Sequence, residues 1–192
     1  MGIFIPLSGR FPENFLYKGK DTFSKQSENN LINAMRRFRQ QLPEEEVKII
    51  LQKATNGVLC LIDNDNRPYG VPMSFIYNGR NTIFFHCALS GRKIDCLKHN
   101  PYACFTIIDK DEIHPEEFTT YYRSVIVEGS VSFLSDRRQM TEALRLLSTK
   151  YSPGIDCEPE IEKGIDRVMI LKLEIDSITG KEAIELTRKR DS

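Results

Sequence analysis

The fold of this chain is decided by residues 82–100, which read Thr-Ile-Phe-Phe-His-Cys-Ala-Leu-Ser-Gly-Arg-Lys-Ile-Asp-Cys-Leu-Lys-His-Asn. The first seven residues alternate between two faces, with Thr82, Phe84, His86 and Ala88 on one and Ile83, Phe85 and Cys87 on the other. This period of two predicts a strand. From Ser90 the apolar residues follow helical spacing, until Asn100-Pro101 ends the pattern. The stretch therefore predicts a strand that runs directly into a helix, with His86 near the end of the strand.

The first turn of that helix carries two cations, Arg92 and Lys93. A helix N-terminus already has partial positive charge and unpaired N–H groups, so two cations are unfavourable there in isolation. A bound anion would reverse this, because the N–H groups from Gly91 onward would hold it together with both side chains. The alternative is that both side chains are simply solvated. The pattern raises a phosphate site as a hypothesis.

Length and charge limit the classes of function. The 192 residues suit one well-buried domain, and Lys plus Arg equals Asp plus Glu at 27 each. Nothing in this balance favours a nucleic acid or an anionic membrane as a partner. Residues 1–42 carry seven basic and three acidic residues, whereas residues 43–192 carry 20 and 24. We expect an N-terminal extension over residues 1–34, loosely docked or mobile, and one domain over residues 35–192.

The five cysteines are odd in number, and most lie inside apolar patterns, which favours reduced thiols. The sequence has no run of about 18 apolar residues. We therefore expect a cytoplasmic protein with no membrane partner.

The sequence before residue 82 predicts one helix and two strands. The helix spans Pro43 to about Thr55, and the strands span Gly57–Asp63 and Tyr69–Tyr77. Asn78-Gly79 favours a tight turn, which would place Pro72–Ser74 across from the strand of His86. Pro72 lacks a backbone donor and indicates a bulge or a sheet edge.

The sequence after residue 100 predicts three more strands. They span Tyr102–Ile108, Thr120–Leu134 and Val168–Ile175, with an acidic loop at Asp109–Glu117, a helix at 136–150 capped by Ser135, a loop at Ser152–Gly164 and a helix at Gly180–Lys189. Gly129 marks a bend in the long strand. Arg123 lies on an otherwise apolar face and should meet an anion or a carboxylate. Hairpin connections between six strands, with helices outside, predict a mainly β protein built on a closed antiparallel barrel.

Several kinds of site are disfavoured. Zinc would need His86, Cys87, Cys96 and His99, but His86 and Cys87 point to opposite faces of one strand, so we predict no metal site. The sequence lacks a Gly-x-Ser-x-Gly elbow, a Walker loop and a Gly-x-Gly-x-x-Gly loop. The strand–helix junction, Arg123 and a histidine that can titrate near neutral pH all suit a phosphorylated cofactor.

Five segments carry a resemblance to a known family. They are Gly57-Val-Leu-Cys-Leu, Tyr69-Gly-Val-Pro-Met-Ser-Phe-Ile-Tyr, Phe85-His-Cys-Ala-Leu-Ser-Gly-Arg-Lys, Thr119-Thr-Tyr-Tyr-Arg-Ser-Val-Ile-Val and Thr179-Gly-Lys-Glu-Ala-Ile-Glu-Leu. In this order they resemble the nitroimidazole-resistance (Nim) family, which belongs to the pyridoxamine-phosphate-oxidase-like split barrels that bind flavin mononucleotide (FMN). The resemblance covers about residues 35–187. It implies a six-stranded antiparallel FMN-binding split barrel that forms a homodimer, with two flavin sites at the subunit interface.

The resemblance also implies roles for individual residues. The strand residues Val71, Pro72, Met73 and Ser74 would line the flavin ring, and His86 matches the active-site histidine beside it. Ala88 and Lys93 would lie at the ribityl-phosphate end, joined by Tyr122 and Arg123. Lys181 matches a lysine that often approaches the cofactor from the partner chain. The charge argument made from the sequence itself favours Lys93 and Arg123, whereas the other roles rest on the resemblance.

The main functional hypothesis is an FMN-dependent oxidoreductase that reduces a nitroimidazole or a related small molecule, with His86 orienting or protonating the substrate. His86 could instead be a core histidine satisfied by a neighbour. A second hypothesis is a non-enzymatic flavin- or haem-binding carrier or sensor on the same fold. A third is a deazaflavin or pyridoxal-type ligand in the same cleft.

Overall fold

The structure, a computed structural model, describes residues 36–190. The predicted extension at 1–34 lies outside these residues, so its boundary stays a prediction. The chain from Arg37 onward forms one compact unit. None of the described helices is long and apolar enough to cross a membrane.

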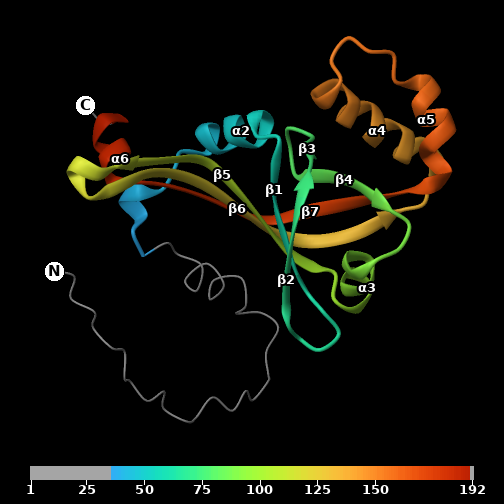
Figure 1. The fold of residues 1–192 in the computed structure, drawn as a ribbon, viewed down its shortest axis with the longest axis horizontal. Helices are drawn as coiled ribbons and strands as arrows, with labels where there is room; N and C mark the ends of the chain where they lie inside the picture. The colour runs from blue at the N-terminus through green and yellow to red at the C-terminus, as the bar shows by residue number, and fades with distance from the viewer. Residues whose placement is uncertain (1–35, 191–192) are drawn as a thin grey trace, which may run out of the picture. The chain divides into compact units, whose positions relative to one another are not determined.

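The described residues form strands and helices, labelled as in Figure 1. The strands are β1 (Asn56–Ile62), β2 (Pro68–Ser74), β3 (Ile76–Tyr77), β4 (Thr82–Ala88), β5 (Tyr102–His114), β6 (Thr119–Leu134) and β7 (Val168–Glu182). The α-helices are α2 (Glu44–Lys53), α3 (Arg92–His99), α4 (Arg137–Tyr151), α5 (Glu158–Gly164) and α6 (Ile184–Arg190). Three 3₁₀ turns, η1 (Phe38–Gln40), η2 (Pro115–Glu117) and η3 (Ile165–Arg167), complete the chain.

The strands form one antiparallel sheet in the order β2-β1-β5-β6-β7-β4-β3. Its two edge strands, β2 and β3, are separated in the chain by Phe75 alone, so the sheet must curl until its edges meet. This closure is the split barrel predicted from the sequence. The prediction of six strands differs only because Phe75, which is fully buried, divides the predicted strand Tyr69–Tyr77 into two.

Three aromatic rings fill the centre of the barrel. Phe105 lies edge-on to Phe75, with ring centroids 4.9 Å apart, and edge-on to Phe85 at 5.0 Å. All three side chains are fully buried. The alternation predicted for residues 82–88 is confirmed, since Ile83, Phe85 and Cys87 are buried and His86 and Ala88 are exposed.

The strands β5 and β7 are longer than the sequence indicates. The predicted acidic loop Asp109–Glu117 is wrong, because β5 continues to His114 by pairing with β6 after a bulge at Asp109. Likewise β7 runs to Glu182, so the final helix begins at Ile184 rather than at Gly180. Polar residues remain in the ladder here because the neighbouring strand supplies hydrogen bonds that local sequence does not reveal.

Gly129 of β6 lies where the register with β7 shifts, which confirms the predicted irregularity. A Cβ atom at this position would collide with the backbone carbonyl of Glu174. The close approach of β7 therefore requires glycine.

Two helix predictions are corrected. Asp136, not Ser135, caps α4, because its carboxylate accepts a hydrogen bond from the amide of Gln139 at 2.8 Å. The predicted loop Ser152–Gly164 contains the helix α5, which is tied to α4 by the two hydrogen bonds that Arg145 donates to Glu158, at 2.6 and 2.8 Å. In Figure 1, α4 and α5 lie at one end of the long strands β6 and β7, and α6 lies at the other end.

Candidate functional site

His86 faces a pocket between the sheet and the helices α4 and α5. The pocket has a volume of about 490 Å³ and is lined by Ser74, His86, Leu144, Leu147, Ser148, Tyr151, Ser152, Cys157, Glu160, Ile161, Gly164, Ile165 and Val168. The imidazole is exposed, and the described residues give it no hydrogen-bond partner. This placement does not match a core histidine satisfied by a neighbour.

The predicted hairpin between Tyr69–Tyr77 and the strand of His86 is much shorter than expected. Only Ile76 and Tyr77 pair with β4, whereas Pro72 lies opposite Val58 of β1, and His86 lies opposite Ile170 of β7. The placement of Pro72–Ser74 across from the His86 strand is therefore wrong. Ser74 and His86 nevertheless line the same pocket, because closure of the sheet brings its β2 edge to β4.

The strand β2 forms one edge of the sheet, as Pro72 indicated. Pro72 and Ser74 are exposed, Val71 is half-buried, and Met73 packs into the core. An edge strand presents backbone N–H and C=O groups that the sheet does not use. Residues 71–74 can therefore offer these backbone groups to a ligand, together with the exposed hydroxyl of Ser74.

The helix α3 begins after Gly91, as predicted, and Gly91 has a φ of +130°, which favours glycine. Its first cation, Arg92, already has partners within the protein. Nη2 lies 3.0 Å from Oδ2 of Asp63, and the guanidinium lies over the ring of Tyr69, 4.3 Å from its centre. The pKa of the Asp63 carboxyl is lowered mainly by a hydrogen bond from the backbone amide of Arg67, and the ion pair with Arg92 lowers it further. Lys93, half-buried, forms no ion pair within residues 36–190, so it is the remaining cation for a phosphate.

Ala88 is exposed at the last position of β4, opposite Val168 of β7. Its side chain is a single methyl group, at the end of the strand that leads to α3 and Lys93. Positions 71–74, His86, Ala88 and Lys93 therefore belong to the part of the fold built from β2, β4 and the start of α3.

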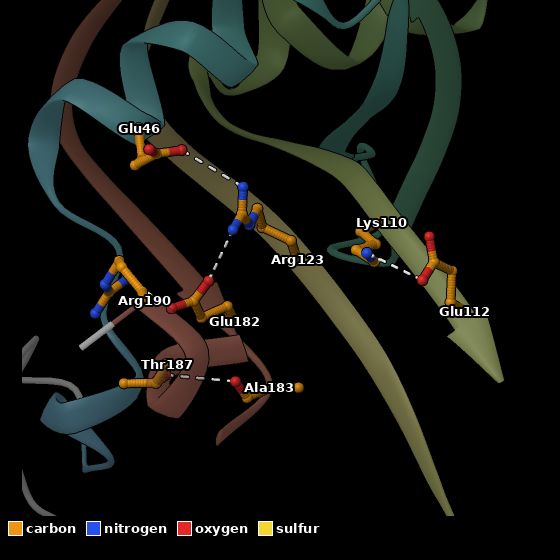
Figure 2. A network of polar contacts seen from close by, with 8 residues as sticks. All are labelled: Glu46, Lys110, Glu112, Arg123, Glu182, Ala183, Thr187 and Arg190. Atoms are coloured by element: carbon orange, nitrogen blue, oxygen red, sulfur yellow. Dashed lines mark hydrogen bonds and ion pairs between the residues drawn. The ribbon is translucent and has the colours of Figure 1, made fainter. Parts of the chain in front are cut away.

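Tyr122, Arg123 and Lys181 lie at a different place, where β6 and β7 approach α2 and α6. The guanidinium of Arg123 meets carboxylates, as expected: Nη2 lies 3.0 Å from Glu182, and Nη1 lies 3.4 Å from Glu46 (Figure 2). Glu182 is fully buried and also contacts Arg190 at 2.6 Å. Each terminal nitrogen of Arg123 therefore has one carboxylate partner and a further N–H group, and the predicted role of Arg123 at a phosphate stays a prediction.

Lys181 lies with its ammonium 5.6 Å from the centre of the Tyr122 ring. No carboxylate pairs with it in the described part of the chain. Lys181 and Tyr122 can therefore still interact with a ligand or with a second chain.

Two of the predicted site residues, His86 and Arg123, lie far apart within one chain. His86 is opposite Ile170 of β7, whereas Arg123 is opposite Glu182 of the same strand. At about 3.3 Å per residue, these positions are roughly 40 Å apart along β7. A mononucleotide bound beside His86 therefore does not reach Arg123 of the same chain.

The outward face of β1, β5 and β6 carries apolar side chains in neighbouring positions. Val58 lies opposite Thr106, which lies opposite Ile126, and the next row places Cys60 opposite Cys104. Val58, Ile126 and Ile108 are 38, 40 and 70% exposed. An exposed apolar sheet face of this kind is typical of a protein interface.

Two residues that the sequence analysis did not select, Lys150 and Tyr151, contact Phe75 at the seam of the barrel, the place between its edge strands β2 and β3. The Tyr151 hydroxyl accepts a hydrogen bond from the amide of Phe75 at 2.8 Å, and it faces the carbonyl oxygens of Thr55 at 2.5 Å and Phe75 at 2.8 Å. The ammonium of Lys150 lies 4.1 Å from the centre of the Phe75 ring. No local pattern in the sequence predicts these contacts, because their partners are 75 or more positions away.

Comparison with solved structures identifies proteins of the same fold. A proposed 5-nitroimidazole antibiotic resistance protein from Bacteroides thetaiotaomicron is 23% identical, with a TM-score of 0.66, over 74% of this chain and 86% of that chain. A conserved hypothetical protein from Mycobacterium tuberculosis is 16% identical, with a TM-score of 0.69, over 83% and 94%. The flavocytochrome Anf3 from Azotobacter vinelandii is 23% identical, with a TM-score of 0.65, over 78% and 72%. Further matches include FAD-binding proteins and an F420 reductase, with TM-scores of 0.52 to 0.55.

No curated protein sequence matches the chain. The sequence profile of the pyridoxamine 5′-phosphate oxidase family, however, matches residues 43–182, which include every strand and the helices α2 to α5. The extent of this match, together with the split-barrel topology, shows that the chain belongs to the pyridoxamine 5′-phosphate oxidase family.

Proposed function

We propose that the protein is an FMN-dependent oxidoreductase that reduces a nitroimidazole or a related small molecule, and that it acts as a cytoplasmic homodimer. The observation that carries this proposal is the exposed His86 beside Ser74 on the wall of a mostly apolar pocket. A site of this kind, with a few polar groups in an apolar cleft, suits a small organic substrate. The similarity to a nitroimidazole resistance protein supports the choice of substrate.

The residues of this chain fit a flavin in three respects. The free edge of β2 at Val71–Ser74 offers backbone groups to the polar rim of a ring system. Ala88 places only a methyl group at the end of the strand that leads to α3. Lys93, without a carboxylate partner among residues 36–190, offers a cation to the phosphate.

A bound flavin would supply the hydride chemistry. His86 would orient the substrate beside the ring and donate a proton to it. The helices α4 and α5 would keep water away from the pocket by covering its outer side.

The proposal of a homodimer rests on the separation of the two residue groups. If the partner subunit places its Lys181 and Tyr122 near the Lys93 end of this subunit, both groups can contact one flavin. The apolar outward face of β1, β5 and β6 offers a surface on which a second copy can pack. Arg123, next to Tyr122, would contribute to the phosphate end from the same place, with Glu46 and Glu182 holding its guanidinium in position.

The first experiment is to record the visible spectrum of the purified protein and to identify by mass the molecule released by heat. We expect a flavin spectrum and the mass of FMN. Release of FAD, haem or a deazaflavin, the cofactors in the names of similar structures, would replace FMN in the proposal. A colourless protein that does not bind added flavin would refute it.

The alternative is a non-enzymatic flavin or haem carrier or sensor, which the matched flavocytochrome favours. Steady-state oxidation of a nicotinamide donor with metronidazole as acceptor separates the two, because a carrier gives no turnover. We expect His86→Ala to reduce that turnover while flavin remains bound. Equal turnover in the variant would remove the proposed role of His86.

A further inference from the structure

None of the residues that line the pocket beside His86 is lysine or arginine, and Glu160 is the one carboxylate among them. The nearby ammonium of Lys150 lies against the ring of Phe75, 4.1 Å from its centre, and does not line the pocket. Leucine, isoleucine and valine side chains form much of the wall. The pocket therefore differs from a site built to hold a phosphate or a carboxylate, which requires cations or clustered N–H donors.

The carboxylate of Glu160 is not neutralised by a neighbour. On the same helix, Glu158 forms a paired contact with Arg145 at 2.6 and 2.8 Å. Glu160 forms no ion pair within the described part of the chain. Glu160 is exposed and lines the pocket, so its charge acts on an occupant of the pocket and is weakened by solvent.

Some neutral polar groups of the pocket already form hydrogen bonds within the protein, and others have none. The Tyr151 hydroxyl is already engaged by the backbone of Phe75 and Thr55. The hydroxyls of Ser74, Ser148 and Ser152 have no hydrogen-bond partner among residues 36–190. Together with His86, they can receive the polar substituents of a ligand.

From these observations we infer that the pocket selects its ligand by charge: it takes neutral or cationic, largely apolar aromatic molecules, rejects anionic ones, and uses Glu160 to favour cations. The inference rests on the proposed function for the identity of the pocket as the substrate site. It also means that a phosphorylated substrate, such as the one that gives the family its name, would meet no cation here. A flavin phosphate would have to lie outside this pocket, on the side of Lys93.

Three probes of nearly equal shape test this inference: 4-nitrobenzylamine, 4-nitrobenzyl alcohol and 4-nitrobenzoate. They differ mainly in carrying a positive charge, no charge or a negative charge. Isothermal titration of each into the flavin-loaded protein measures binding without requiring turnover. We expect the carboxylate to bind at least about tenfold more weakly than the amine, with the alcohol between them.

Substitutions in α5 test whether Glu160 causes the preference for cationic probes. Glu160→Gln should remove the preference for the amine over the alcohol, and Glu160→Lys should reverse the order of amine and carboxylate. Glu162→Lys is the matched control, because Glu162 lies on the same helix, is exposed and does not line the pocket. It makes the same change in net charge, and we expect it to shift the ratio of the two affinities by less than about twofold.

A second pair of variants tests whether the probes occupy this pocket. Ser148→Phe should fill the space and weaken all three probes at least about tenfold, whereas Thr149→Phe, at the exposed next position, should leave binding unchanged.

The inference is overturned if none of the three probes binds, if the carboxylate binds as tightly as the amine, or if Glu160→Lys acts no more strongly than Glu162→Lys. Binding in the expected order by a protein that gives no turnover of a nicotinamide donor with metronidazole would support the pocket assignment and refute the oxidoreductase. The two proposals therefore fail in distinguishable ways.

Discussion

The hydroxyl oxygen of Tyr151 lies 2.8 Å from both the amide nitrogen and the carbonyl oxygen of Phe75, the residue that separates β2 from β3. A residue between two sheet edges lacks ladder partners, and one side chain from α4 here supplies them. The same phenol ring lines the pocket beside Ser74 and His86. The last turn of α4 thus connects the seam of the barrel to the candidate site.

We expect Tyr151→Phe to lower the free energy of unfolding by about 1–3 kcal/mol, because it leaves the amide and the carbonyl of Phe75 without partners. The affinity for flavin should fall as well, since Ser74 is the neighbour of Phe75. Urea unfolding and flavin titration measure the two effects. Tyr102→Phe is the control, because Tyr102 is 67% exposed. Equal stability of the two variants would contradict this role for Tyr151.

Lys150 should make the free energy of unfolding depend on pH in the alkaline range. Burial over the Phe75 ring, with no hydrogen bond to Nζ, lowers the pKa of Lys150 below 10.5. Between its folded pKa and 10.5 the unfolded chain binds more protons, so stability should rise with pH across this window and level off above it.

Lys150→Met should abolish that rise. At neutral pH the variant should be within about 1 kcal/mol of the wild type, because the lost cation–π attraction is offset by removal of a buried charge. Urea midpoints measured from neutral pH to pH 10.5 check this. Lys163→Met, at an exposed lysine of α5, is the control and should keep the slope. An unchanged slope in Lys150→Met would disprove the assignment.

Glu182 should be among the most sensitive polar residues of the described chain. It is fully buried between Arg123 and Arg190, at 3.0 and 2.6 Å (Figure 2). We expect Glu182→Gln to lower the free energy of unfolding by about 3–5 kcal/mol, because both arginines lose their buried counter-charge.

The control for Glu182 is Glu112→Gln. Glu112 pairs with Lys110 at 3.0 Å but is 57% exposed, so its loss should cost about 0–1 kcal/mol. Thermal unfolding of both variants tests the difference. Similar melting temperatures would show that the Glu182 pairs do not stabilise the fold.

The proposed shared site can be tested with mixed dimers. We expect the Lys93→Glu and Lys181→Glu homodimers each to retain little flavin, because each loses a cation at both sites. A heterodimer with one subunit of each kind should recover about half of the wild-type flavin content if Lys93 and Lys181 of different subunits meet at one site. No recovery would place each site within a single chain.

The outward sheet face gives a separate test of the dimer. Ile126→Arg should yield monomers in sedimentation velocity, since it places a charge in the apolar face formed with Val58 and Ile108. Ile155→Arg, at an isoleucine that is 69% exposed beyond α4, should remain dimeric. Dimers of Ile126→Arg with full flavin content would exclude this face as the interface.

The sequence by itself determined the features that local chemistry controls. The alternation of residues 82–88 set the two faces of β4, Gly91 marked the start of α3, and Pro72 indicated a sheet edge. The unfavourable isolation of Arg123 predicted a partner, either an anion or a carboxylate, though not which residue. Glycine, proline and binary patterning act over a few residues, so their signals can be read without the fold.

The tertiary structure alone decided which distant residues meet. The acidic segment after Ile108 is a strand because β6 pairs with it. Arg92, a candidate anion ligand from the sequence, forms an ion pair with Asp63 instead. Closure of the barrel brought Ser74 to His86 although their strands are not neighbours in the sheet. It also placed Tyr151 on Phe75. These contacts join residues tens of positions apart, and they form only because the chain buries a common core.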